Sequence, residues 1–118
     1  MSMNITIREN RGVTVIDLSG RLTLGGAPAI LRDDIRRLLD EGKTRLLLNL
    51  AGLTYLDSAG MGLLVHAYAT VTRSGGQLKL SNLTSRVKDL LIITKLCTVF
   101  EIYDDEASAV ASFAALAR

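Results

Sequence analysis

The chain has no tryptophan, one cysteine, one histidine and one proline, and aromatic residues make up 4% of its 118 residues. A single cysteine excludes an internal disulfide and a cysteine-based zinc site. Cys97 stands in an apolar segment, which favours a buried structural thiol. The opening sequence MSMNITIREN lacks the apolar core of a signal peptide, and no apolar run approaches the ~20 residues of a membrane span. These absences lead us to expect a cytoplasmic protein without membrane insertion.

The charged residues do not cluster in one part of the sequence. The formal net charge of +2 arises from 14 basic and 12 acidic residues that are spread through the chain. Arg32, Arg36 and Arg37 gather in one predicted helix, where they are typical of a solvated face. With few aromatic residues and no basic stripe, the sequence argues against a nucleic-acid partner.

Hydrophobic periodicity divides the chain into short strands and helices. The first half is predicted to form a hairpin that turns at Arg11-Gly12, a helix from Ala27 to Leu39, and a strand from Arg45 to Leu50 that is followed by a loop. A helix from Asp57 or Ser58 to about Ser74 comes next, and then a strand at QLKLSNL. The chain is predicted to end with a helix from Thr84 or Ser85, a strand at FEIY and a closing helix at DDEASAVASFAALAR. In that last helix, acids in the first turn and Arg118 at the end match the helix dipole.

Strands that alternate with helices imply parallel pairing with right-handed crossovers. We therefore expect an α/β fold: an N-terminal hairpin, then alternating strands and helices, forming one mixed, mostly parallel sheet with helices packed on it. The sequence shows no repeat, no low-complexity tract and no linker, so we expect a single domain over residues 1–118.

The stretch TYLDSAGMGLLVHAY, residues 54–68, is the most distinctive in the chain. Its apolar residues predict a helix with one buried stripe: Met61, Leu64, Val65, Tyr68 and Ala69. The helix begins at Asp57 or Ser58, and both residues are good N-caps. Ser58 can therefore be a cap alone, a nucleophile, or a site where a partner adds a charge.

Two glycines favour more than a cap. Gly60 and Gly62 lie in the start of the helix, where each costs up to about 1 kcal/mol relative to alanine. Their missing side chains would leave the backbone open to the close approach of a partner. The loop after a parallel strand is also where α/β proteins place functional groups. A phosphate on Ser58 would be tolerated at a helix start and would carry a charge of roughly −1.5 to −2.

Catalysis by Ser58 is excluded by spacing. His66, the only histidine, lies eight residues further along the same helix, about 12 Å away by the helical rise. The sequence around Ser58 is L-D-S-A-G, not the G-x-S-x-G of a nucleophile elbow. LGGAP, residues 24–28, lacks the spacing and the lysine of a P-loop, and no acidic or histidine cluster indicates a metal site. We expect neither an enzyme nor a bound cofactor.

Asp57 offers an alternative from another class. It follows a central strand, as the phospho-accepting aspartate of a response-regulator receiver does. That chemistry needs further acids at the end of the first parallel strand to hold magnesium, and here only Asp17 lies close. A receiver-like or small-ligand α/β domain is therefore a lesser hypothesis.

The chain resembles a STAS domain, the domain of anti-sigma factor antagonists and of sulfate-transporter tails. The residues that carry the resemblance are Gly20-Arg21-Leu22, Ala27-Pro28 at a helix start, LLLNLAGLTYLDSAGMGLLV and KLCTVFEIY. The match runs from about Ile5 to Phe113, so the free-standing antagonist is the closer type.

The resemblance implies a phosphorylation switch. In that family the unphosphorylated antagonist binds a serine-kinase anti-sigma factor, which then releases its sigma factor. The kinase phosphorylates the serine of the D-S motif, here Ser58, and weakens its own binding; a PP2C-type phosphatase is a further implied partner. The partner-binding residues implied in this chain are Thr23, Asp57, Ser58, Ala59, Gly60, Met61 and Gly62.

Two residues depart from the family pattern. Many antagonists carry an acid at the position of Thr23 and an aspartate at the position of Asn49. The loop from Thr23 to Gly26 is expected near the same rim of the sheet as Ser58. A threonine in place of an acid at position 23 therefore affects which partner this surface would bind. The alternative function is a STAS scaffold subunit of a stressosome-like or lipid-transporter assembly, in which Ser58 is mainly a helix cap.

Overall fold

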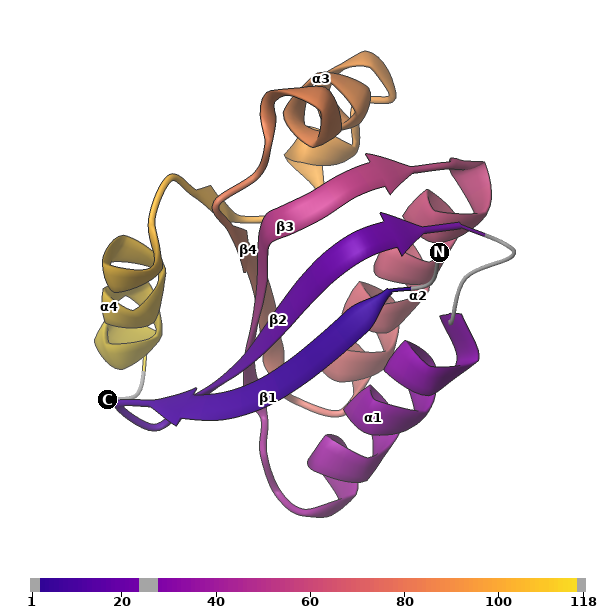
Figure 1. Cartoon of the computed structure of the whole chain (residues 1–118). Coiled ribbons are helices and arrows are strands. Elements are labelled where there is room, and N and C mark those ends of the chain that lie inside the picture. Colours follow the sequence, from indigo (N-terminus) through magenta and orange to yellow (C-terminus); the bar gives the residue numbers. More distant parts are fainter. Residues whose placement is uncertain (1–2, 24–27, 117–118) are drawn as a thin grey trace.

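The computed structural model describes residues 3–23 and 28–116, which build one five-stranded sheet and its covering helices (Figure 1). The sheet has the strand order β1-β2-β3-β4-β5. The strands are β1 (Asn4–Asn10), β2 (Val13–Leu22), β3 (Arg45–Leu56), β4 (Gln77–Ser81) and β5 (Ile102–Tyr103). The helices are α1 (Pro28–Asp40), α2 (Ser58–Arg73), α3 (Ser85–Ile93), the 3₁₀ turn η1 (Leu96–Thr98) and α4 (Glu106–Leu116).

The expected hairpin and mixed sheet are confirmed. β1 pairs with β2 antiparallel, and every later pair is parallel. Arg11 and Gly12 connect β1 to β2 with φ angles of +53° and +83°. Two residues with positive φ form the turn whose twist matches that of the flanking strands.

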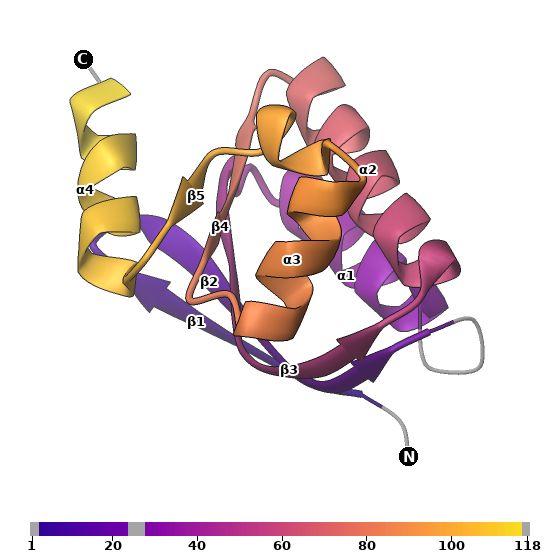
Figure 2. The same cartoon turned by 90° about the horizontal axis from the view of Figure 1, so that it is seen from above.

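The helices cover the two faces of the sheet unequally, as Figures 1 and 2 show: α1, α2 and α3 lie on one face and α4 lies on the other. β3 contributes side chains to the cores on both faces of the sheet, because successive side chains of a strand point to opposite faces. Leu46 and Leu48 belong to the larger core under α1, α2 and α3. Leu47 belongs to a smaller core with Val110 and Phe113 of α4. This arrangement explains why the strand is apolar at consecutive positions.

β3 extends beyond the strand predicted to end at Leu50. It continues to Leu56, in pairing with β2, through two register shifts. Gly52 permits the close approach that this needs, since a Cβ there would lie 2.7 Å from the Cβ of Ser19. The segment after Leu50 was expected to be a loop because Ala51-Gly52 interrupts the apolar run, but tertiary pairing keeps it extended.

An ionic network fastens α4 to the hairpin. Arg8 Nε lies 2.7 Å from Asp17 Oδ2, and Arg8 Nη1 donates to Glu106 Oε2 at 2.9 Å. These hydrogen bonds hold the pKa of both carboxyl groups below its ordinary value and raise that of Arg8. Asn49 Nδ2 donates to Asp17 Oδ1 at 2.7 Å. The departure at position 49 thus places an amide donor, rather than a second carboxylate, beside Asp17.

Three further expectations concern the chain away from the Asp-Ser stretch. Cys97 lies in η1 at the molecular surface and is half-buried, so the prediction of a buried thiol was wrong in degree. Ala27 at the helix start and Arg118 at the chain end lie outside the described residues. In the described part of the chain, every helix is too short or too polar to cross a bilayer.

Candidate functional site

The start of α2 is capped by Asp57, not by Ser58. Asp57 has an extended backbone, and its Oδ1 accepts a hydrogen bond from Gly60 N at 2.8 Å. Its carbonyl accepts from Met61 N at 2.9 Å, which closes the first helical turn. Ser58 is therefore the first helical residue. Ser58 does not cap α2, as the alternative function had it, because the side chain of Asp57 accepts the hydrogen bond from the exposed N–H of Gly60 instead.

The sheet brings Thr23 beside Asp57. β2 and β3 run parallel with Leu22 opposite Leu56, and Asp57 N donates to Leu22 O at 3.3 Å. Thr23 follows Leu22 at the same rim and is half-buried. The expected neighbourhood of Thr23 and the Asp-Ser pair is confirmed, whereas residues 24–26 of the expected loop lie outside the described residues.

The two glycines of α2 have different roles. Gly60 is buried, and a Cβ there would overlap the carbonyl oxygen of Leu22 and lie 2.8 Å from the Leu56 side chain. Its missing side chain lets α2 pack onto the ends of β2 and β3, so the expectation that it makes room for a partner was wrong. Gly62 is exposed, and a Cβ there would meet nothing within 4 Å.

The surface around Ser58 is open and made of small side chains. Ser58, Ala59 and Gly62 are exposed, and Asp57 is half-buried. Met61 is half-buried and packs against the larger core on the other flank of the helix. The buried stripe of α2 consists of Gly60, Leu63, Leu64, Ala67 and Val71. It is shifted from the predicted stripe toward α1, because α2 packs against α1 as well as against the sheet.

The chemistry available to Ser58 is that of an accessible hydroxyl. His66 is exposed on the same helix, eight residues away, or about 12 Å along the axis. No group of three histidine, cysteine or acidic residues within 3–23 and 28–116 could hold a metal ion. Ser58 can accept a group from another protein, and a charge placed there would face solvent.

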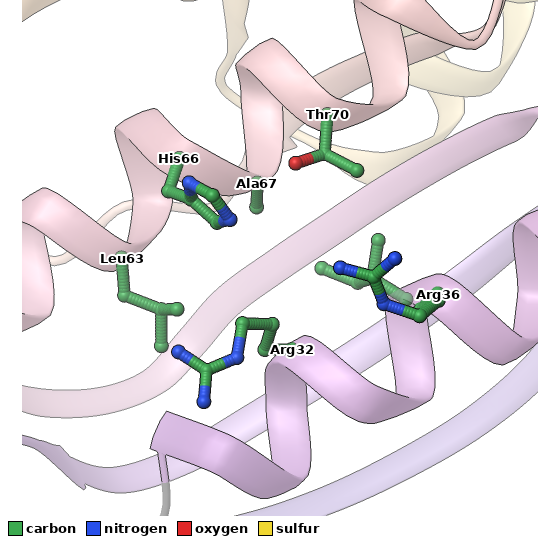
Figure 3. Close-up of a pocket in the computed structure, with 7 residues that line it drawn as sticks. Arg32, Arg36, Leu63, His66, Ala67 and Thr70 are labelled. Atoms are coloured by element: carbon green, nitrogen blue, oxygen red, sulfur yellow. The ribbon is translucent and has the colours of Figure 1, made fainter.

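A groove between α1 and α2 was not found from the sequence (Figure 3). Arg32 and Arg36 of α1 face His66 and Thr70 of α2 across it. From their place in the sequence alone, these arginines are typical of a solvated helix face. In the sequence, Arg32 and Arg36 are four residues apart, and so are His66 and Thr70. These two pairs form one site only because α1 and α2 pack against each other.

Comparison with known proteins gives a consistent result. The model of the STAS domain family matches residues 4–109. The anti-sigma-B factor antagonist of Bacillus subtilis (strain 168) is 31% identical over 102 residues, covering 86% of this chain and 92% of that protein. The anti-sigma F factor antagonist of Paenibacillus polymyxa is 29% identical over 114 residues, covering 92% of this chain and 93% of that protein.

Solved structures agree on the fold. The anti-sigma factor antagonist SpoIIAA in its unphosphorylated form superposes with a TM-score of 0.79 at 21% identity, covering 98% of this chain and 100% of that one. The phosphorylated form, from Bacillus, gives a TM-score of 0.71 at 21% identity, covering 93% and 99%. The expected α/β architecture is confirmed by both likenesses.

Proposed function

This chain belongs to the STAS domain family, and from that premise we propose that it is an anti-sigma factor antagonist. Relatives named as antagonists cover most of its length at about 30% identity. The role is that of a binding protein whose partner is an anti-sigma factor. The whole chain, residues 1–118, acts as a single domain in this role.

The finer proposal is that phosphorylation of Ser58 switches the interaction. The observation that carries it is the exposed position of Ser58 as the first residue of α2, after a cap that is already supplied by Asp57. Because the hydroxyl is not used to cap the helix, its modification need not disturb the fold. Unphosphorylated, the chain sequesters a serine-kinase anti-sigma factor, and a sigma factor is released.

The charge of the phosphate supplies the switch. Residues 57–62 contain one charged side chain, the carboxylate of Asp57, and no basic side chain that would neutralise a phosphate. The added charge of about −1.5 to −2 therefore faces the partner without a basic side chain beside it in residues 57–62. Repulsion and the cost of desolvating the phosphate weaken binding without a rearrangement of the domain. A PP2C-type phosphatase restores the binding form.

The proposed contact surface consists of Thr23, Asp57, Ser58, Ala59, Gly60, Met61 and Gly62. Its members contribute in different ways. Ser58, Ala59 and Gly62 offer exposed, small surface, and Asp57 fixes the helix start through its bond to Gly60 N. Gly60 contributes by letting the helix pack close to Leu22, next to Thr23.

The test uses a serine-kinase anti-sigma factor as the partner. Incubation with this kinase and ATP should add one phosphate, measured by intact mass, and Ser58→Ala should abolish the addition. Ser58→Asp should weaken binding to the kinase at least about tenfold, equivalent to 1.4 kcal/mol. Isothermal titration calorimetry measures that change.

Ser85→Ala is the matched control. Ser85 is also an exposed serine at the first position of a helix, after the side-chain cap Thr84. The Ser85→Ala variant should still take up one phosphate at Ser58, and it should bind the kinase with the affinity of the wild type. Phosphate uptake by Ser58→Ala, or unchanged affinity of Ser58→Asp for the kinase, would rule out the switch.

A further inference from the structure

The groove between α1 and α2 is cationic on the side of α1 and apolar at its base. Arg32 and Arg36 extend into the gap from α1, and His66 and Thr70 lie on the α2 side (Figure 3). The remaining lining residues are Ile35, Leu63 and Ala67. No acidic side chain lines the groove, so its polar groups are hydrogen-bond donors or cations together with one hydroxyl.

The two arginines are available for a ligand. Within the described part of the chain, neither guanidinium has a carboxylate within 4.0 Å or a side-chain hydrogen bond. Arg37, on the same helix, differs: it lies 3.4 Å from Asp34 Oδ1 and 3.3 Å from Glu41 Oε2. α1 thus pairs the arginine outside the groove and leaves the two at the groove without an anion.

The size of the groove favours side chains over a small molecule. The groove is shallow and open to solvent, with a volume of about 10 Å³, room for about one water molecule, whereas small-molecule sites enclose roughly 300–1,000 Å³ and surround their ligand. Ile35, Leu63 and Ala67 are buried below the groove, whereas Arg32 and Arg36 are exposed at its rim, where the carboxylates of a partner can reach them from solvent. Guanidinium groups match carboxylates in charge and in geometry.

The groove is continuous with the surface around Ser58. Ser58, Gly62 and His66 are spaced four residues apart and so lie on one face of α2. All three are exposed, and no large side chain separates Ser58 from His66 along this face. A protein segment that contacts the start of α2 can therefore follow the helix into the groove.

We propose that the groove between α1 and α2 binds an acidic segment of a protein partner, with carboxylates on Arg32 and Arg36 and a contact to His66. That this partner is also the protein that covers Ser58 rests on the proposed function. The binding of an acidic segment at the groove does not rest on it. Ser58 lies about 12 Å from His66 along α2, beyond the Debye length of about 8 Å at physiological salt. The groove and the phosphate therefore contribute separately to binding.

The test is a titration of the ¹⁵N-labelled full chain with an alanine-rich helical peptide that carries glutamates four residues apart. At physiological ionic strength, amide shifts should concentrate at residues 32–36 and 63–70. Arg32→Gln/Arg36→Gln should weaken binding roughly threefold to tenfold, because two exposed ion pairs are lost. A peptide with lysines in place of the glutamates should not produce these shifts.

Arg37→Gln/Arg86→Gln is the control with the same loss of charge, and both of its sites lie away from the groove. It should change the affinity for the glutamate peptide less than twofold. Ser58→Asp should leave the groove shifts unchanged, so this titration and the kinase experiment fail or succeed independently. Absence of groove shifts, equal losses in the two double variants, or equal binding of inorganic phosphate at the same residues would overturn the proposal.

Discussion

The starts of α2 and α3 are built on the same local plan and differ in their surroundings. Asp57 caps α2 and Thr84 caps α3, each by accepting a hydrogen bond from the backbone N–H three residues later. Each cap is followed by an exposed serine, Ser58 or Ser85. An accessible serine at a helix start therefore does not distinguish a signalling site from an ordinary helix.

The difference lies in the next residues. Gly60 occupies the third helical position of α2, where it packs against Leu22, whereas Val87 fills that position of α3 with a buried side chain. The surface after Ser58 is small and uncharged, while Arg86 and Lys88 follow Ser85. A phosphate at Ser85 would have a cation, Lys88, and an anion, Asp89, on its face of the helix, whereas residues 59–62 offer a phosphate at Ser58 no charged side chain.

The largest effect should come from the position three residues after the cap. Gly60→Ala should lower the free energy of unfolding by about 1–3 kcal/mol, because its Cβ overlaps the backbone of Leu22. Gly62→Ala should raise that free energy by up to about 1 kcal/mol, since the site is open and alanine favours the helix. Urea denaturation measures both; similar effects of the two substitutions would show that Gly60 is not a packing residue.

The second-largest effects on stability should come from substituting the two N-cap residues. Asp57→Ala should cost about 1–2 kcal/mol and Thr84→Ala about 0.5–1 kcal/mol of unfolding free energy. The reason for the order is the bond length, 2.8 Å to Gly60 N against 3.4 Å to Val87 N, together with the charge of the aspartate. Thermal unfolding compares the two variants. A larger loss for Thr84→Ala would reverse this assignment of cap strength.

The smallest effect should come from charge at the serines themselves. Ser85→Glu should stabilise the fold by about 0.3–1 kcal/mol, because the helix dipole favours an anion there and the attraction of Lys88 offsets the repulsion of Asp89. Ser58→Glu should gain less, since the carboxylate of Asp57 repels the new charge. Urea midpoints at low salt measure the difference, and 0.5 M salt should reduce it. An equal gain at both positions would contradict the repulsion between Asp57 and a charge at position 58.

Much of the fold could be predicted from the sequence because local patterns and tertiary packing agree there. The turn at Arg11-Gly12, the helix predicted from Ala27 to Leu39 and observed over Pro28–Asp40, and the apolar strand from Arg45 are present. Where local and tertiary preferences differ, the prediction failed. β3 continues past Gly52 because β2 offers it a pairing partner, which no local pattern shows.

By itself, the sequence determined the fold class, the position of the helix start and the serine that follows it, since these depend on periodicity and on residues adjacent in the chain. Only the tertiary structure decided which glycine is needed for packing and which arginines lack an anion. Those properties depend on contacts between segments far apart in sequence: Leu22 against Gly60, and α1 against α2. A pattern along the chain cannot contain them, because they arise from the distances that folding creates.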